Sequence, residues 1–251
     1  MLLLIDAGNT RVKWALAAPG AGVGQWSSSG AAPHAGLDAA AAGWHGQNVT
    51  AALVSNVAGA VLRERLSALL GPIVTEWFAS SGARAGLVNG YREPQRLGCD
   101  RFAAAIGARA LAPGQALVVA TCGTATTVDA VSADGRFAGG MILPGLALMA
   151  GALAQNTAQL PQAAPAPGSA PPPLFADNTN DAIVSGCLSA QAGAIERAVS
   201  AHAQALCILS GGAAPYIAPA LKCRYRMVDN IVLVGLHAAA LFDMPMGDGT
   251  C

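Results

Sequence analysis

The order of hydrophobic and polar positions along the chain predicts an alternation of strands and helices. Short apolar runs bounded by Gly, Pro, Asn or Asp are typical of strands, whereas apolar residues three or four positions apart indicate amphipathic helices. We expect strands at residues 2–6, 11–17, 23–29, 51–56, 73–77 and 206–210. We expect helices at residues 61–70, 101–111, 180–202, 215–221 and 234–242. This alternation favours the α/β fold class.

One pattern occurs twice in the chain. The segments LLLIDAGNTRVK, at residues 2–13, and ALVVATCGTATTV, at residues 116–128, each contain an apolar strand, a tight glycine turn and a second strand. Moving the first segment by 115 positions places Gly8 on Gly123. The sequence therefore predicts two β-hairpins of the same design, one in each half of the chain.

Two similar domains follow from this repeat. We expect an N-terminal domain at residues 1–113 and a C-terminal domain at residues 114–251, each with a mixed sheet flanked by helices. Because ligands often bind between such domains, we expect the active site in the cleft between them. In the second domain, GGMILPG at 139–145 is interpreted as a turn and the proline-rich stretch 161–173 as a surface loop.

Composition excludes several functional classes. With 53% apolar and 11% charged residues and no net charge, the chain is neither disordered nor equipped with the basic stripe of nucleic-acid-binding proteins. The longest apolar tract, residues 141–154, is too short for a membrane span and contains Pro144. Six widely spaced cysteines favour free thiols in a reducing compartment, so we expect a cytoplasmic protein. No histidine has a partner that the sequence identifies, so all four are interpreted as structural or exposed.

The first hairpin has the chemistry of a nucleotide-binding turn. Gly8 lets the backbone approach a phosphate, and the amides around Asn9 can form an anion-binding nest. Asp6 could hold Mg²⁺ through water, Lys13 could reach the phosphates, and Thr124 offers a hydroxyl in the second hairpin. The candidate ATP-binding residues of the first hairpin are Asp6, Ala7, Gly8, Asn9, Thr10, Arg11, Val12 and Lys13. An ordinary solvated hairpin is the alternative, and the second copy argues against it.

A second candidate site precedes the helix expected at residues 101–111. Arg101 suits a ligand carboxylate as a bidentate partner, and Asp100 could accept a proton from an attacking hydroxyl. Tyr91 would line the same loop. The structural alternatives are that Asp100 caps the helix and pairs with Arg101, and that Tyr91 is a half-buried aromatic residue. Thr179 most simply caps the helix at 180–202, and a substrate contact is its other interpretation.

The glycine turns match neither the GxxxxGK[ST] loop nor the GxGxxG fingerprint. Hairpin-based phosphate binding resembles the superfamily of actin, hexokinase and Hsp70, which has duplicated ribonuclease-H-like (actin-like) domains. More specifically, DxGNTxxK, YxxPxxLGxDR, GTATTxD, GGxIxPG and NTxxAI occur here in this order. With these motifs the chain resembles type III pantothenate kinase from residue 2 to about residue 241.

The resemblance implies an activity, cofactors and an assembly. It implies that pantothenate is phosphorylated by ATP to 4′-phosphopantothenate, the first step of coenzyme A biosynthesis, by a cytoplasmic homodimer. It implies a requirement for Mg²⁺ and for a monovalent cation, K⁺ or NH₄⁺. It also implies that Asp100 is the catalytic base and that Asp6 to Lys13 and Thr124 contact ATP. The pantothenate contacts that it implies are Tyr91, Gly98, Cys99, Asp100, Arg101 and Thr179.

One position departs from the family pattern. Thr121 stands where much of the family has an aspartate that is associated with the monovalent cation. A threonine hydroxyl is a weaker, neutral ligand, so the cation dependence is in question, and Asp129 on the next strand is a candidate replacement. Two other functions compete with pantothenate phosphorylation: a kinase or phosphatase of the same superfamily acting on another small acid or sugar, and a non-catalytic nucleotide-binding regulator.

Overall fold

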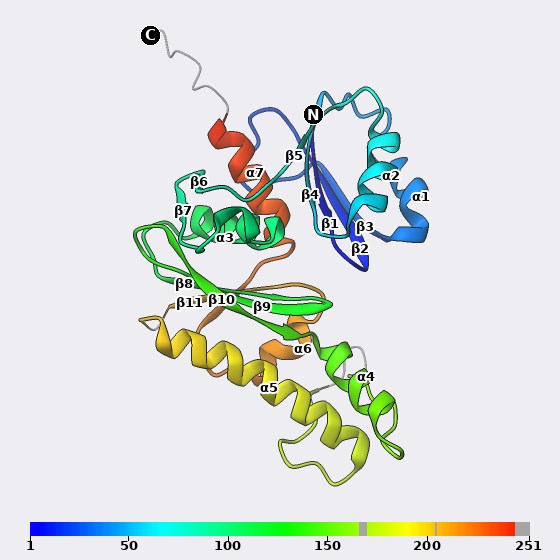
Figure 1. Ribbon diagram of the computed structural model, residues 1–251, viewed down its shortest axis with the longest axis vertical. Helices are drawn as coiled ribbons and strands as arrows, with labels where there is room; N and C mark the ends of the chain where they lie inside the picture. The colour runs from blue at the N-terminus through cyan, green and yellow to red at the C-terminus, as the bar shows by residue number, and fades with distance from the viewer. Residues whose placement is uncertain (166–169, 204, 244–251) are drawn as a thin grey trace. The chain divides into compact units, whose positions relative to one another are not determined.

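The computed structural model describes residues 1–165, 170–203 and 205–243 of the chain. The fold consists of two compact α/β units (Figure 1). Unit 1 comprises Met1–Pro113, Gly135–Phe137 and Asn230–Cys251, and unit 2 comprises Gly114–Asp134 and Ala138–Asp229.

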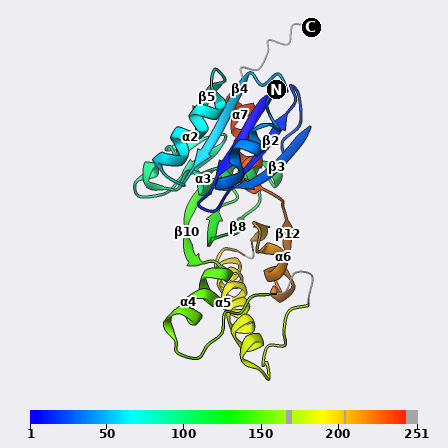
Figure 2. The same ribbon diagram turned by 90° about the vertical axis from the view of Figure 1, so that its right-hand side faces the viewer.

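Unit 1 is built on a five-stranded mixed sheet in the order β3-β2-β1-β4-β5 (Figure 2). Its strands are β1 (Leu2–Ala7), β2 (Arg11–Ala17), β3 (Ser28–Pro33), β4 (Ala51–Asn56) and β5 (Val74–Trp77). The central strand β1 pairs antiparallel with β2 and parallel with β4. The strand expected at residues 23–29 is wrong, since β3 begins only at Ser28. The Gln25 N–H donates to the Gly22 carbonyl at 2.9 Å, and this turn prevents an earlier extended strand.

Helices cover both faces of the unit 1 sheet (Figure 1). On one face, α1 (Leu37–Ala41) and α2 (Ala60–Leu70) pack on the cluster that contains Leu3 and Ile5. Apolar residues of β1, β2 and β4 in this cluster alternate with residues that point to the opposite face, where α3 and α7 lie. The remaining elements of the unit are η1 (His34–Gly36), β6 (Ala83–Arg84), β7 (Leu87–Asn89), η2 (Pro94–Arg96), α3 (Cys99–Leu111) and α7 (Ile231–Asp243).

The final helix α7 corrects the expected domain division, which assigned it to the C-terminal domain. It groups with unit 1 because it packs along α3. The absence of side chains on two glycines allows this close approach: a Cβ added at Gly107 would lie 2.7 Å from the Gly235 nitrogen, and a Cβ added at Gly235 would overlap the Ala103 carbonyl. The end of the chain therefore completes the N-terminal unit.

Unit 2 has strands in the order β12-β11-β8-β9-β10. Its strands are β8 (Leu117–Cys122), β9 (Ala125–Val131), β10 (Arg136–Pro144), β11 (Leu206–Ser210) and β12 (Tyr225–Met227); the first residues of β10, Arg136 and Phe137, belong to unit 1 and pair there with β7. The turn predicted at 139–145 is therefore wrong, because this segment continues a strand. Its double glycine does not reverse the chain, because β10 continues through it from Arg136 to Pro144 as one strand beside β9.

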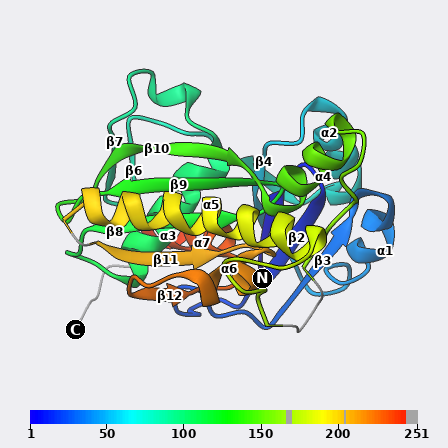
Figure 3. The ribbon, with the colours of Figure 1, turned by 90° about the horizontal axis from the view of Figure 1, so that it is seen from below.

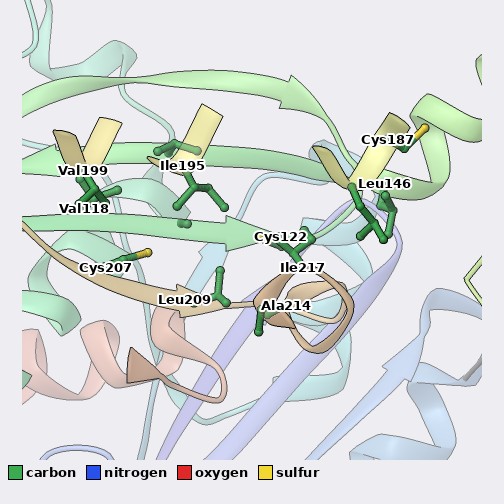
Figure 4. Close-up of a cluster of buried hydrophobic side chains, with 14 of the residues drawn as sticks. Val118, Cys122, Leu146, Cys187, Ile195, Val199, Cys207, Leu209, Ala214 and Ile217 are labelled. Atoms are coloured by element: carbon green, nitrogen blue, oxygen red, sulfur yellow. The ribbon is translucent and has the colours of Figure 1, made fainter. Parts of the chain in front are cut away.

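Helices of unit 2 pack on one face of its sheet. They are α4 (Leu146–Asn156), α5 (Thr179–Ala201), α6 (Ala214–Ile217) and the short η3 (Ala218–Ala220). Helix α5 runs lengthwise along the strands of this sheet and contacts β8, β9 and β11 (Figure 3). Its Ile195 and Val199 share a buried cluster with Val118 and Cys122 of β8 and Leu209 of β11 (Figure 4). This cluster is the core of the unit.

Two further observations concern the rest of the chain. Residues 161–165 and 170–173 of the proline-rich stretch form no helix or strand, and residues 166–169 lie outside the described residues. Among the described helices, none combines the length and the apolar character needed to cross a membrane.

The two hairpins of the repeat, β1–β2 and β8–β9, share a design but differ by one residue. Asp6 pairs with Lys13 across the first hairpin, whereas Thr121 pairs with Thr127 across the second. The shift of 115 positions is therefore correct only up to the glycine, and 114 applies after the turn. As a consequence, the structural counterpart of Lys13 is Thr127, and the second hairpin has no positively charged side chain at this position.

Candidate functional site

In unit 1, three polar side chains stand on one face at the ends of neighbouring strands. Asp6 of β1 is registered with Lys13 of β2 on one side and with Ser55 of β4 on the other. The alternation of β-strand side chains places all three opposite the apolar cluster that contains Ile5. This is the face on which α3 lies, since the Ser55 hydroxyl contacts Cys99 at the start of that helix.

Asp6 has an unusual electrostatic environment. Burial raises the pKa of its carboxyl group from 3.8 to about 6, the Lys13 ammonium group opposes this rise, and the Asp100 carboxylate adds to it. The two carboxyl groups, which are far apart in the sequence, thus repel each other within unit 1. A cation between or beside them would relieve this repulsion, and oxygen ligands of this type suit Mg²⁺.

The turn between β1 and β2 presents exposed backbone. The Gly8 N–H donates to the Arg11 carbonyl at 3.1 Å and closes the turn, while Asn9 and Thr10 at its tip are exposed. His34 Nε2 lies 2.8 Å from the Gly8 carbonyl oxygen. Sequence reasoning missed this contact, because no motif links two residues 26 positions apart.

The other histidines also have backbone partners, which agrees with their interpretation as structural or exposed residues, although the sequence did not identify the partners. His45 Nε2 lies 3.2 Å from the Leu69 carbonyl, and His202 Nε2 lies 2.9 Å from the Val131 carbonyl. His237 Nδ1 accepts a hydrogen bond from the Gly24 N–H at 3.2 Å, and burial lowers its pKa. Among the four, only the bond of His34 is to the nucleotide-type turn.

Asp100 lies in the first turn of α3, one residue after the helix begins. The alternative interpretation of Asp100 as the helix cap is wrong, because Gly98 occupies the N-cap position and no side chain caps the helix. The Asp100 Oδ1 atom instead accepts a hydrogen bond from the Arg101 N–H at 2.8 Å. Burial raises the pKa of Asp100, although this amide and the Arg101 guanidinium oppose the rise. A carboxylate with a raised pKa is a better proton acceptor than an ordinary aspartate at neutral pH.

Gly98 makes room for this carboxylate. A Cβ added at Gly98 would lie 2.7 Å from the Asp100 Oδ1 atom. The backbone of Gly98 has a φ of −54°, which any residue can adopt, so the requirement for glycine is one of space. The LGxDR motif therefore has a steric explanation.

Arg101 is a buried cation at the site, with an exposed fraction of 7%. Its Nη1 atom donates to the Tyr91 hydroxyl at 3.5 Å, and its guanidinium carbon lies 5.8 Å from the Tyr91 ring centre and 5.9 Å from the Phe137 ring centre. The predicted association of Tyr91 with Arg101 is thus present in the structure. Sequence reasoning missed Phe137, because it lies at the start of β10 and no local motif connects it to Arg101. A partly desolvated guanidinium over two rings is well suited to a ligand carboxylate.

Cys99 contacts the end of β4. Its Sγ atom lies 3.4 Å from the Ser55 hydroxyl and 3.6 Å from the Asn56 carbonyl oxygen. Burial raises the pKa of the Cys99 thiol, so the side chain is a neutral link between α3 and β4. The prediction of free thiols is confirmed for the described cysteines, which are Cys99, Cys122, Cys187, Cys207 and Cys223. Cys251 lies outside the described residues.

In unit 2, the turn of the second hairpin is held by close backbone packing. The Gly145 N–H donates to the Thr124 carbonyl at 2.9 Å, and a Cβ at Gly145 would overlap the Gly123 carbonyl. Gly211, with a φ of 100°, packs in the same way against the Cys122 carbonyl. The glycines of GGxIxPG and of the strand-to-helix turn after β11 thus support the turn that contains Thr124.

The structure also places Asp129 relative to Thr121. Thr121, its cross-strand partner Thr127 and Asp129 share the face of the β8–β9 hairpin opposite the buried cluster that contains Val118. Asp129 is buried, with an exposed fraction of 1%, whereas Thr121 is half-buried. The described residues contain no group of three or more His, Cys, Asp or Glu side chains that could hold a metal ion.

Thr179 does not cap α5, contrary to its simplest interpretation. Asn178 is the cap, and its Oδ1 atom accepts a hydrogen bond from the Asp181 N–H at 3.0 Å. Thr179 is the first residue of the helix and lines an apolar hollow of about 510 Å³ in unit 2. The other lining residues are Met149, Leu153, Leu160, Ala182, Ile183, Gly186 and Cys187.

Comparison with solved structures shows which known fold the chain has. A putative 2-dehydro-3-deoxygalactonokinase from Sinorhizobium meliloti has a TM-score of 0.59 at 17% identity, covering 98% of this chain and 100% of that chain. A conserved putative Baf family transcriptional activator from Campylobacter jejuni has a TM-score of 0.60 at 19% identity, covering 93% and 94%. The two α/β units, each with its glycine-turn hairpin, therefore form the fold of the actin-like ATPases and sugar kinases.

Sequence comparisons identify the family. The model of the family described as type III pantothenate kinase matches residues 2–201. The type III pantothenate kinase of Herminiimonas arsenicoxydans is 57% identical over 258 residues, covering 98% of this chain and 99% of the relative. That of Janthinobacterium sp. (strain Marseille) is 54% identical over 260 residues, with the same coverage. The chain belongs to the type III pantothenate kinase family, which confirms the resemblance seen in its motifs.

Proposed function

We propose that this chain transfers the γ-phosphoryl group of ATP to the primary hydroxyl of pantothenate and forms 4′-phosphopantothenate, the first step of coenzyme A biosynthesis. The observation that carries the proposal is the arrangement in unit 1. Asp100 and Arg101 begin a helix on the same face of the sheet as Asp6 and Lys13. A proton acceptor, a carboxylate-binding cation and a phosphate-binding turn are thus supplied by one unit, in a chain of the named family.

Arg101 and Tyr91 would position the acceptor. The pantothenate carboxylate pairs with the buried guanidinium, which the Tyr91 and Phe137 rings contact. The primary hydroxyl is thereby directed to Asp100. Cys99 contributes through its backbone, since its thiol contacts β4. We also propose that Thr179 contacts pantothenate through its hydroxyl, as the family motif implies.

Asp100 orients the hydroxyl and accepts its proton. The hydroxyl oxygen forms a bond to the γ-phosphorus in line with the breaking bond between that phosphorus and the β–γ bridging oxygen, and ADP leaves. We propose that the turn from Asp6 to Lys13 holds the phosphates through backbone amides, and that Thr124 contacts ATP, as the family motif implies. Positioning and charge stabilisation of this kind supply most of the catalysis in phosphoryl transfer.

The chemistry of Asp6 fits Mg²⁺. Its half-buried carboxyl group has a raised pKa and is repelled by the Asp100 carboxylate, an arrangement that a divalent cation stabilises. When bound, the cation offsets the charge of the phosphates. Asp6 would hold it through water, and Lys13 would contact the phosphates directly.

A monovalent cation is the second ion in the proposal. Thr121 offers only a neutral oxygen, and we propose that K⁺ or NH₄⁺ binds weakly there. Thr121→Asp should then lower the K⁺ concentration needed for half-maximal activity at least about fivefold, because a carboxylate attracts the cation more strongly than a hydroxyl. Activity measured over a range of KCl, with choline chloride as the ionic-strength control, checks this. An unchanged K⁺ response would remove Thr121 from the cation site.

The assembly is proposed to be a homodimer, as the family resemblance implies. Unit 2 exposes large apolar side chains, among them Ile142, Leu148 and Phe175, with exposed fractions of 64%, 51% and 92%. Surfaces of this kind are often covered by a partner subunit. Light scattering after size-exclusion chromatography should give twice the mass of one chain, and a monomer at micromolar concentration would contradict it.

The acceptor is tested by ADP release. The purified chain, ATP and Mg²⁺ are combined with pantothenate or with a panel of other small hydroxy acids and sugars. Pantothenate should give the highest kcat/KM, and mass spectrometry should show 4′-phosphopantothenate as the product. Preference for another acceptor would favour the other small-molecule kinase, and nucleotide binding without turnover on any acceptor would favour the regulator.

A further inference from the structure

We propose that His34 is a positioning residue of the nucleotide-phosphate turn. The inference rests on the proposed function only in treating the turn after β1 as the phosphate-binding one. His34 begins η1, which follows β3, and its Nε2 atom lies 2.8 Å from the Gly8 carbonyl oxygen. Because a carbonyl oxygen can only accept, Nε2 carries the proton and donates it. The donor is present in the neutral Nε2–H tautomer as well as in the imidazolium form.

Because the peptide bond is planar, the contact between His34 and the Gly8 carbonyl also sets the direction of the next backbone N–H. The Gly8 carbonyl and the Asn9 N–H belong to one planar trans peptide, so they point in opposite directions. Holding the carbonyl toward His34 directs the Asn9 N–H away from His34. Asn9 is exposed, and within the described part of the chain its N–H donates to no protein group. An exposed, fixed amide of this kind is a donor for a phosphate oxygen.

His34 is itself fixed by α2. The Arg65 Nη1 atom donates to the His34 carbonyl at 2.7 Å, and the Arg65 guanidinium also forms an ion pair with Asp38. Helix α2 thus holds His34, and His34 holds the Gly8 carbonyl. The Gly8 carbonyl in turn fixes the direction of the exposed Asn9 N–H. We infer that these contacts hold the turn in its phosphate-binding conformation before the nucleotide binds. The loss of conformational entropy when the nucleotide binds is therefore smaller.

The test compares variants that keep or remove the donor. His34→Ala should weaken binding of a non-hydrolysable ATP analogue with Mg²⁺ about tenfold in calorimetric titration, since the part-buried hydrogen bond to the Gly8 carbonyl and the order of the turn are lost. The KM for ATP should rise by a similar factor, and the KM for pantothenate should stay unchanged. His34→Gln, which still carries an N–H donor, should recover most of the affinity.

His45→Ala is the matched control. It removes a bond of the same type in the same unit, but its acceptor is the Leu69 carbonyl in the last turn of α2. Its nucleotide affinity should equal that of the wild type, even if both alanine variants lower the melting temperature equally. Should His34→Ala not fold, His34→Phe, a flat ring without a donor, replaces it in the comparison with His34→Gln.

The outcomes separate this inference from the proposed function. Affinity of His34→Ala within about twofold of wild type, no recovery in His34→Gln, or an equal loss in His45→Ala would overturn the role of His34. A wild-type chain that binds the analogue but does not phosphorylate pantothenate would overturn the proposed function alone. A wild-type chain that binds no nucleotide would overturn both.

Discussion

At the scale of single residues, the site depends on two carboxyl groups that the fold keeps partly out of water. Asp6 and Asp100 each have a raised pKa, and burial is the largest cause for both. Lys13 and Arg101 offset part of this cost. Carboxyl groups in such surroundings destabilise the empty protein and are typical of functional sites.

The first prediction concerns Asp6 and pH. Its folded pKa of about 6 exceeds the ordinary value of 3.8, so the folded chain binds this proton more tightly than the unfolded chain does. The contribution of Asp6 to stability therefore falls as pH rises from about 4 to about 6. Asp6→Asn should raise the melting temperature of the nucleotide-free chain by several degrees at about pH 7.5, hardly change it at about pH 4, and abolish activity.

Thermal unfolding of both chains at the two pH values, without nucleotide or Mg²⁺, measures this difference. The same shift at both pH values would mean that the effect of Asp6→Asn is unrelated to ionisation of the carboxyl group.

The second prediction concerns the space that Gly98 leaves for Asp100. In Gly98→Ala the new Cβ would stand 2.7 Å from Oδ1, so the carboxylate must turn away. We expect kcat to fall at least about tenfold while the affinity for nucleotide is retained. Gly193→Ala in α5 is the control, because its Cβ would meet no atom within 4 Å. A Gly98→Ala enzyme as fast as the control would show that the carboxylate needs no such space.

At the scale of elements, the position of Asp100 depends on how α3 is packed. One side of this helix contacts β4 through Cys99, and another packs along α7, where Gly107 and Gly235 bring the backbones together. A helix from the end of the chain thus supports the helix that carries the proposed base.

The third prediction tests this packing. In Gly235→Ala the added Cβ would overlap the Ala103 carbonyl, and backbone on both sides prevents a small local adjustment. We expect a loss of about 3 kcal/mol or more in the free energy of unfolding. Gly193→Ala, by contrast, should stabilise its helix slightly, by about 0.5–1 kcal/mol. Urea unfolding of the two variants and the wild type gives the values, and equal stability of all three would contradict the close approach of α3 and α7.

At the scale of the whole molecule, the sequence predicted what local patterns specify. The two hairpins, the order of most strands and helices and the placement of Tyr91 near Arg101 follow from periodicity, turn residues and motifs. The start of β3 and the strand at β10 did not, because glycines near both are compatible with either a turn or a strand. The single-residue offset between the hairpins is invisible without the register of the strands.

Contacts between residues far apart in the sequence were also not predicted. The return of α7 to unit 1, the placement of Phe137 beside Arg101 and the bond from His34 to Gly8 all join residues that no local pattern connects. The two carboxylates Asp6 and Asp100 were each found by motif, but only the fold shows that they interact.

The central claim is that Asp100 accepts the proton of the pantothenate hydroxyl during phosphoryl transfer, and turnover by Asp100→Asn tests it most directly. Asparagine keeps the size of the side chain but cannot take up the proton. The account predicts that kcat falls by about 10²–10⁴ while the affinity for the ATP analogue stays within about twofold of wild type. Wild-type turnover by Asp100→Asn would contradict it.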